Sequence, residues 1–323
     1  MNTSTNKPLV SICCITYNHH LYIRQCLNGF LMQKTNFAFD VIINDDCSTD
    51  GTTEILREYA SKYPDIIKPI LQDENQYAKG VRGMFQHFVF PKAQGKYFAI
   101  CEGDDYWTDP LKLQKQVDYL EAHPNFSMCF HRVKCFAEKG RVGQDIFGYL
   151  TTKDYFVNDC NEFFKRWLVP TCSILMRGEL LHKIPSNPLF TYGDSVIIAT
   201  CLNNGPIHCI GEDMGVYRLT PGGWNGSQNE IRKVELQISH AKGMLQEFDF
   251  YRCNTVYTQL QNYYLMLLLY FKKSNNKEKY NYYFEDYFEV CSPISPSSFK
   301  LKRYILVNEV LSFLHNLKHK LIR

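Results

Sequence analysis

The fold is decided by residues 100–107, which read Ile100-Cys101-Glu102-Gly103-Asp104-Asp105-Tyr106-Trp107. An apolar run over residues 97–101 leads directly into three carboxylates placed around one glycine. Such a run is typical of a buried strand, and a strand that stops at acidic residues delivers them to one edge of a sheet. Open α/β sheets bind their ligands at that edge. The stretch therefore predicts an acidic site at the end of a buried strand.

Three carboxylates within four residues repel one another unless a positive charge lies between them. A divalent cation meets this need, because Mg²⁺ typically takes one or two protein carboxylates together with phosphate oxygens. The alternative is a solvated acidic turn that caps the following helix. Residues 100–107 alone leave both alternatives open.

Three more strand-to-helix units are expected upstream of this stretch. The predicted strands cover residues 9–16, 39–44 and 66–71. Helical segments are predicted at residues 22–33 and 79–90, and a helix with Ile55, Leu56 and Tyr59 on one face is predicted to end before Pro64. After the acidic stretch, Asp109-Pro110 is a good helix start, with an Asp cap and Pro at the first helical position. Four such units in about 120 residues predict a doubly wound α/β layer.

The second half of the chain is less regular. Strands are expected over residues 126–136, 171–177, 208–210 and 215–218, a loop over 139–153, and a helix over 196–202. A turn-rich boundary follows at residues 221–226, and the pattern beyond it is helical. We therefore expect a first domain of residues 1–222, with halves of about 1–125 and 126–222, and a helical region of residues 223–323.

The composition is that of a folded protein, with 45% hydrophobic and 21% charged residues among 323. A formal net charge of +3 is too small to indicate a nucleic-acid partner. Thirteen cysteines lie mostly in apolar runs without zinc-ligand spacing, which predicts buried thiols in a reducing compartment. The polar residues 1–8 do not resemble a signal peptide, and the apolar run 263–271 is about half of the roughly 20 residues that span a bilayer. We expect a cytoplasmic protein.

Polar clusters follow three of the first four predicted strands. They are Thr16/Asn18, Asp45/Asp46 and Glu102/Asp104/Asp105, which share one edge if the sheet is parallel. No GxGxxG turn and no GxxxxGK[ST] loop is present, so a nucleotide here would be held by side chains and a metal. Asp45 or Asp46 would accept hydrogen bonds from a base or a ribose. Helix capping by Asp46 or Ser48 is the alternative.

These motifs resemble those of the family 2 glycosyltransferases, which have the GT-A fold. The matching stretches are Val10-Ser11-Ile12 with Thr16-Tyr17-Asn18, residues 42–52, and residues 102–107. The resemblance runs from about residue 9 to residue 218. It implies an inverting hexosyltransferase that uses a nucleotide-diphospho-sugar, often UDP-linked, together with Mg²⁺ or Mn²⁺. It also makes residues 1–125 the nucleotide-binding half and residues 126–222 the acceptor half.

The resemblance assigns roles by position. Nucleotide-sugar binding falls to Thr16, Asn18, Asp46, Arg82, Glu102 and Asp104, and metal binding to Asp104 and Asp105. For Arg82, a solvated helix start is the alternative. The chain departs from the family pattern where Glu102 replaces the usual Asp and Cys47 the usual Gly. The Asn-Gly and Arg-Asn stretch usual after the third strand appears only as residues 75–82.

The proton acceptor is expected at a second acidic motif. Inverting transfer needs a base that takes the proton of the attacking hydroxyl, while a metal stabilises the leaving diphosphate. Tyr192-Gly193-Asp194-Ser195 resembles the family's second acidic motif, so Asp194 is the predicted catalytic base. The alternative for Asp194 is an N-cap. Trp107 is expected to pack on the sugar or base or else in the core, and Arg218 is a candidate for the diphosphate.

The C-terminal region suggests further partners. Residues 263–288 are rich in Tyr, Phe and Leu, which predicts helices packed on the catalytic domain or on a second copy in a homodimer. Residues 300–323 combine an apolar stripe with Lys and Arg, which predicts either a helix lying on an anionic membrane surface or an ordinary packed helix. The first alternative places the protein at the inner face of the cell membrane and suits a lipid-linked saccharide acceptor.

The expected function is sugar transfer in surface-polysaccharide or glycolipid assembly, and two alternatives are open. A sugar-1-phosphate nucleotidyltransferase would carry a glycine- and lysine/arginine-rich loop after the first strand, unlike residues 16–20. A non-catalytic nucleotide-sugar-binding module would not need Asp104, Asp105 and Asp194 together.

Overall fold

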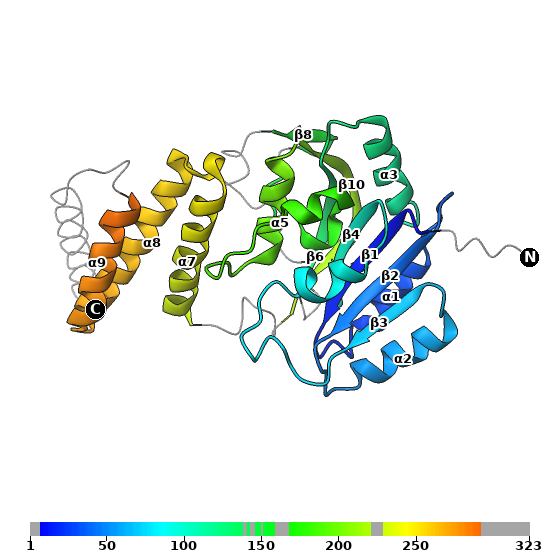
Figure 1. The fold of residues 1–323 in the computed structure, drawn as a ribbon, viewed down its shortest axis with the longest axis horizontal. Helices are drawn as coiled ribbons and strands as arrows, with labels where there is room; N and C mark the ends of the chain where they lie inside the picture. Colours follow the sequence, from blue (N-terminus) through cyan, green and yellow to red (C-terminus); the bar gives the residue numbers. More distant parts are fainter. Residues whose placement is uncertain are drawn as a thin grey trace, which may run out of the picture. The chain divides into compact units, whose positions relative to one another are not determined.

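The computed structural model of the protein describes residues 7–137, 141–142, 146–149, 151–158, 168–220 and 229–291. Its chain divides into two compact units (Figure 1). The first comprises Met1–Ser186 with Tyr192–Ser227, and the second comprises Asn187–Thr191 with Gln228–Arg323. The expected boundary between residues 222 and 223 lies a few residues before this division.

The first unit is built on a sheet of ten described strands, in the order β3-β2-β1-β4-β9-β6-β10-β5, with β7 beside β6 and β8 beside β10. The parallel part consists of β1 (Val10–Thr16), β2 (Phe39–Asp45), β3 (Ile67–Leu71) and β4 (Tyr97–Glu102). The other strands are β5 (Tyr106–Trp107), β6 (Met128–Ala137), β7 (Arg141–Val142), β8 (Tyr155–Val157), β9 (Leu175–Arg177) and β10 (Ile207–Leu219). Because β9 runs antiparallel to β4 and β6, the sheet is mixed.

Helical elements cover both faces of this sheet (Figure 1). On one face lie α1 (Ile23–Leu31), α2 (Thr52–Lys62) and α3 (Lys112–Ala122). On the other lie α5 (Gly193–Leu202) and the π-helical η1 (Phe85–Val89). Successive residues of β1 enter opposite cores, since Ile12 and Cys14 face the first group and Cys13 the second. Burial on both faces explains the continuous apolar runs and defines the doubly wound arrangement.

Three expected elements differ in the structure. The helical segment 79–90 is reduced to η1 and the 3-10 turn η2 (Phe90–Lys92), because Gly80 and Gly83 take positive φ values of 93° and 69°. The strand expected over 171–177 begins as the 3-10 turn η3 (Thr171–Ser173), and only β9 is extended; η4 (Gly178–Lys183) follows it. The two short strands near residues 208 and 215 are one strand, β10, whose register shifts between Ile210 and Gly215.

The second unit consists of α7 (Glu230–Glu247), the turn η5 (Asp249–Tyr251), α8 (Asn254–Lys273) and α9 (Lys277–Cys291) in its described part. Asn229 caps α7 by accepting a hydrogen bond from the Arg232 N–H at 2.7 Å. A buried hydrogen bond of 2.7 Å from the Tyr264 hydroxyl to Asp286 joins α8 to α9. Within the described ranges, no helix combines the length and apolarity that crossing a membrane requires. Residues 300–323 lie outside the described residues.

Candidate active site

The carboxyl ends of β1, β2 and β4 meet at one edge of the sheet. Thr16 pairs with Asp45 across β1 and β2, and Ile15 pairs with Glu102 across β1 and β4. A Cβ atom on Gly103 would lie only 2.6 Å from the Thr16 hydroxyl, so the glycine of the acidic stretch allows this close approach. The Thr16 hydroxyl is buried and finds no hydrogen-bond partner among the described residues.

The loops after β1 and β2 are tied together by Asn18. Its side-chain oxygen accepts a hydrogen bond from the Thr49 N–H, and its own N–H donates to the Ser48 hydroxyl, both at 2.8 Å. Asn18 and Cys47 both have left-handed backbones, with φ values of 54° and 64°. Non-glycine residues in this conformation are strained and cluster at functional sites. The conformation also explains why glycine suits the position of Cys47.

Asp45, the last residue of β2, and Asp46 support different segments. Asp45 accepts hydrogen bonds from the Ser48 N–H at 3.3 Å and from the Thr53 hydroxyl. The N-cap of α2 is Gly51, without a side-chain capping hydrogen bond, so neither Asp46 nor Ser48 caps that helix. Asp46 accepts hydrogen bonds from the N–H groups of Gln76 and Tyr77, at 2.8 and 3.0 Å. Asp46 therefore fixes the segment after β3 at the edge of the site. Its contact with a nucleotide base stays a prediction.

The carboxylates of the acidic stretch repel one another. Asp105 is 1% exposed, and its Oδ1 accepts a hydrogen bond from the Arg218 N–H at 2.7 Å. Burial, and then the charge of Asp104, hold the pKa of Asp105 well above its usual range. Burial also raises the pKa of Glu102, with smaller contributions from Asp104, Asp105 and Asp194. A cation brought to this edge would relieve the repulsion.

Asp104 is the accessible carboxylate of the stretch. Its Oδ2 lies 4.0 Å from His19 Nε2 and accepts a hydrogen bond of 3.5 Å from the Thr220 hydroxyl. Burial lowers the pKa of His19, while Asp104 acts to raise it. His19 was not expected in the site, since the sequence shows it only as part of a polar turn. Its carbonyl accepts the first N–H groups of α1, which holds the ring beside Asp104.

Asp194 lies near the start of α5, on the other side of the site. Its Oδ1 accepts a hydrogen bond from the Ser195 N–H at 2.8 Å, and its Oδ2 accepts one from the Thr171 hydroxyl at 3.2 Å. The N-cap position of α5 is Tyr192, so Asp194 is not its N-cap. Burial raises the pKa of Asp194. The turn η3 connects the two acidic motifs, because its Thr171 hydroxyl binds Asp194 while the carbonyl of Cys172 accepts a hydrogen bond from Trp107 at the end of the acidic stretch.

A glutamine without any recognisable motif around it lies beside the start of α5. Gln86, in η1, has a buried side-chain oxygen without a hydrogen-bond partner among the described residues. A Cβ on Gly193 would lie 3.7 Å from the Gln86 amide. The segment after β3, which contains Gln86, thus lies beside Gly193, the residue that precedes Asp194. Single π-helical turns are frequent at functional sites.

The other candidate residues have different surroundings. The Arg218 guanidinium donates to the Asp104 carbonyl and lies 4.4 Å from the Tyr106 ring centre. Arg82 is exposed and engaged with its own loop, where it donates to the Tyr77 carbonyl at 2.9 Å and stacks on the Tyr77 ring. Trp107 is buried and donates to the Cys172 carbonyl at 2.7 Å, so it packs in the core.

The carboxylates at the carboxyl ends of the parallel strands suit a divalent cation that also binds a diphosphate. Among the described residues, no three His, Cys, Asp or Glu side chains are grouped to hold a metal by themselves. An ion that shares phosphate oxygens needs only one or two carboxylates. Asp104 has a side-chain exposure of 19% and offers one; Asp105 is buried against Arg218 and the Cys172 thiol. Asp104 is therefore the better placed of the two expected ligands.

Comparison with known proteins identifies the family. Residues 11–184 match the glycosyl transferase family 2 model, and the chain belongs to that family. The uncharacterized protein Rv1520 of Mycobacterium tuberculosis is 39% identical over 226 residues, which are 69% of this chain and 63% of that protein. The match thus spans less than two thirds of this relative. The putative teichuronic acid biosynthesis glycosyltransferase TuaG of Bacillus subtilis is 37% identical over 114 residues, 35% of this chain and 42% of TuaG.

A solved structure shares the fold. S. aureus TarS 1-349, determined in complex with UDP-GlcNAc, superposes with a TM-score of 0.53 at 19% identity, over 87% of this chain and 91% of that one. The fold of the first unit is therefore the GT-A fold of glycosyltransferases, with helices following it in the chain.

Proposed function

We propose that this protein transfers a sugar from a UDP-linked donor to an acceptor hydroxyl with inversion. The observation that carries the proposal is the connection of two acidic motifs through η3, which binds Asp194 at the start of α5 through Thr171 and bonds to the stretch at the end of β4 through Cys172 and, just after the turn, Ile174. One motif serves the donor diphosphate and the other the attacking hydroxyl. A neighbour in the fold, TarS, binds UDP-GlcNAc, which supports the choice of donor class.

The proposed binding of the donor rests on residues at the carboxyl ends of the parallel strands. The buried Thr16 hydroxyl has no hydrogen-bond partner in the described part of the chain, and Asn18 fixes the two loops between which a nucleoside would lie. Asp104 would hold Mg²⁺ or Mn²⁺ together with the diphosphate, and the metal supplies Lewis-acid stabilisation of the leaving group. Arg218, held against Tyr106, adds a fixed positive charge beside Asp104.

Asp194 would act as the general base. The acceptor oxygen attacks the anomeric carbon, the bond to the diphosphate breaks, and the hydroxyl proton passes to Asp194. A pKa raised by burial makes this carboxylate a stronger base, and its two hydrogen bonds hold it in place. Thr171 is thus a positioning residue for the base.

We propose that the acceptor is a saccharide that is extended during surface-polysaccharide or glycolipid assembly. TuaG, a putative enzyme of teichuronic acid biosynthesis, supports the polysaccharide class. A lipid-linked saccharide would be met at the inner face of a membrane, where the basic residues 300–323 would contact anionic lipid. The aromatic C-terminal helices would offer a surface for a second copy.

A donor screen tests the proposal. The melting temperature is measured with UDP-, GDP- and dTDP-sugars, each with Mn²⁺, with Mg²⁺ and with EDTA. We expect stabilisation by a UDP-sugar with metal and less with EDTA, because a ligand that binds only the folded state stabilises it. Asp104→Asn should remove the metal-dependent part. No stabilisation by any nucleotide sugar would overturn the proposal, and pyrophosphate release from UTP and a sugar 1-phosphate would favour a nucleotidyltransferase.

A further inference from the structure

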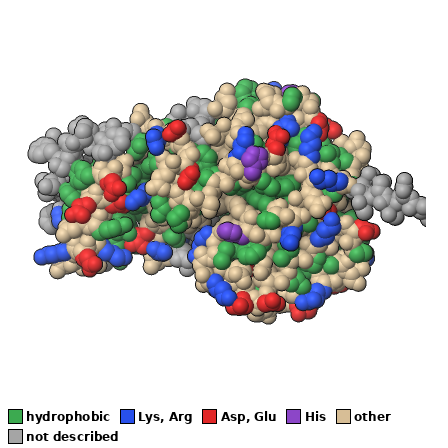
Figure 2. Space-filling view, viewed as in Figure 1, with side chains coloured by type: hydrophobic (Ala, Val, Ile, Leu, Met, Phe, Trp, Pro, Cys, Tyr) green, Lys and Arg blue, Asp and Glu red, His purple; other side chains and the backbone are tan. Residues whose placement is uncertain are grey.

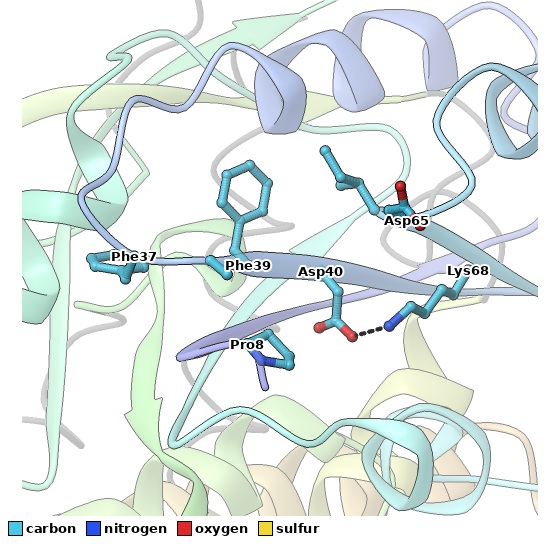
Figure 3. A pocket seen from close by; sticks show the side chains of 8 residues that line it. Pro8, Phe37, Phe39, Asp40, Asp65 and Lys68 are labelled. Carbon is cyan, nitrogen blue, oxygen red and sulfur yellow. Dashed lines mark hydrogen bonds and ion pairs between the residues drawn. The ribbon is translucent and has the colours of Figure 1, made fainter. Parts of the chain in front are cut away.

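A pocket lies at the edge of the sheet opposite the acidic stretch (Figure 3). It has a volume of about 360 Å³ and is found where β1, β2 and β3 begin. Its lining residues are Pro8, Phe37, Ala38, Phe39, Asp40, Asp65, Ile66 and Lys68. Phe37, Phe39 and Ile66 are partly buried and pack on one face of the sheet, whereas Asp40, Lys68 and Pro8 lie on the other side of β2 (Figure 3).

Asp40 is the unusual member of this lining. It interrupts the apolar run of β2 and is 3% exposed. One of its oxygens accepts an ion-paired hydrogen bond from Lys68 Nζ at 2.7 Å, and the other is buried without a hydrogen-bond partner among the described residues. In Figure 3 this second oxygen points to the side on which Pro8 lies. A buried carboxylate that lacks a hydrogen bond is costly, and a donor from a ligand would remove that cost.

We propose that this pocket binds a neutral saccharide. A carboxylate beside an ammonium group suits neighbouring hydroxyls, because one hydroxyl donates to Asp40 while the next accepts from Lys68. The ring of Pro8, which lies on the same side of β2 as the Asp40 carboxylate in Figure 3, offers an apolar surface to the C–H face of a sugar ring. Asp40, Lys68 and Asp65 together carry a formal charge of −1, which disfavours phosphate and nucleotide ligands.

The position of the Lys68 side chain controls access from solvent to the buried Asp40 carboxylate. Its side chain is 48% exposed, against 4% for Asp40, so it covers the carboxylate from the solvent side. Rotation of this long, flexible side chain opens both Asp40 oxygens to a hydroxyl group without moving the strand. Lys68 then remains close enough to donate to the same sugar.

The pocket is separate from the acidic edge. Asp40 and Asp45 lie on one strand, five positions apart, which is roughly 16 Å at about 3.3 Å per residue. Saccharide binding here would hold an acceptor or product chain while transfer takes place at the other edge. That use rests on the proposed function, but binding itself requires neither donor nor turnover.

Saturation-transfer-difference NMR tests the site in the full-length protein. Maltose, cellobiose and N,N′-diacetylchitobiose serve as probes at millimolar concentration, with glucose 6-phosphate as the anionic comparison. We expect at least one disaccharide to give signals that persist with saturating UDP and Mn²⁺ and in Asp194→Asn. Asp40→Asn should reduce these signals at least fivefold, and Lys68→Met should reduce them too. Lys62→Met, an exposed lysine on α2, is the matched control and should leave them unchanged.

Several results would overturn the proposal. Absence of signal for all three disaccharides would do so, as would equal signals in wild type, Asp40→Asn and Lys68→Met. Displacement of the signals by UDP and Mn²⁺ would assign them to the acidic edge instead. Circular dichroism of each variant shows that it is folded, and Lys68→Met keeps the test valid if Asp40→Asn does not fold.

Discussion

Cys47 has a backbone conformation that suits glycine better than cysteine. Its φ of 64° places it in the left-handed region, while its thiol lies 3.4 Å from the Asp73 carbonyl. Cys47→Gly should be more stable than Cys47→Ala by roughly 1 kcal/mol, because both variants lose the thiol and only alanine keeps the strained Cβ. Urea unfolding of the two variants measures this difference. Equal stabilities would show that the residue is not strained in solution.

Lys112 is a buried charge that the proposed reaction does not use. Its side chain is fully buried, and Nζ lies 3.7 Å from the Trp107 ring centre, in a cation–π contact. Among the described residues, Nζ has no hydrogen-bond partner. Burial lowers the pKa of Lys112 from 10.5 to about 7. Trp107 lies on β5, shortly after the carboxylates Glu102, Asp104 and Asp105. Its contact with Lys112 therefore stabilises β5, which follows the site in the chain.

This lowered pKa predicts a pH-dependent stability. Between about pH 7 and 10 the unfolded chain keeps the Lys112 proton and the folded chain loses it, so the free energy of unfolding rises with pH in that range. Lys112→Met should reduce the rise, since methionine carries no charge and packs well on an indole. Chemical unfolding at pH 7, 8 and 9 tests this, with Lys62→Met as the exposed control. An unchanged slope in Lys112→Met would refute it.

The sequence predicts some of these residues better than others. Thr16, Asp46 and Asp104 could be found because each follows an apolar run, and parallel strands bring such ends to one edge. His19 and Gln86 could not, because they reach the site through the α1 entry turn and a π-helical turn that have no clear sequence signal. The contrast between Asp104, which is accessible, and Asp105, which is buried against Arg218, depends on contacts more than 100 residues apart.

Among the elements, the segment after β3 is held mainly by contacts with the end of β2 and the residues that follow it. The Asp46 carboxylate accepts the N–H groups of Gln76 and Tyr77, and this segment leads to Gln86 beside the start of α5. The sequence predicted a helix here, whereas left-handed glycines at 80 and 83 leave turns that need external support. The segment therefore depends on β2 for its position.

Asp46→Asn should loosen this segment. An amide replaces one of the two accepting oxygens with a donor, so one backbone hydrogen bond is lost, which costs about 1 kcal/mol. We expect trypsin to cleave after Lys79 and Arg82 severalfold faster, as followed by mass spectrometry. Asp73→Asn, an exposed position in the same segment, is the control. Identical cleavage rates in Asp46→Asn and wild type would mean that Asp46 does not hold the segment.

For the whole molecule the net charge is small, although residues 300–323 hold six Lys and Arg residues and one Glu. Figure 2 shows basic and acidic side chains interspersed on the face that it presents, in keeping with a net charge of only +3. The fold class follows from the sequence because four apolar runs with helical spacing between them predict a doubly wound sheet. The antiparallel insertion of β9 between β4 and β6 does not follow from local patterns.

We predict that the basic segment of residues 300–323 binds to anionic membranes. Replacing Lys318, Lys320 and Arg323 with glutamine should weaken co-sedimentation with vesicles that contain 30% phosphatidylglycerol, by about tenfold if each cation contributes roughly 1 kcal/mol and salt screens part of it. Vesicles of phosphatidylcholine alone are the control. Equal binding by both proteins would leave the membrane role of this segment without support.

In the proposed reaction, Asp194 accepts the proton of the attacking hydroxyl while the edge with Asp104 binds the donor. A comparison of wild type with Asp194→Asn tests this division of roles, with the donor Kd measured by calorimetry with Mn²⁺ and the transfer rate measured with the sugar nucleotide that the screen identifies. We predict a donor Kd within about threefold of wild type and a kcat reduced at least 100-fold, since general-base catalysis contributes about 10²–10⁴. A variant that binds donor and still transfers sugar at the wild-type rate would contradict the account.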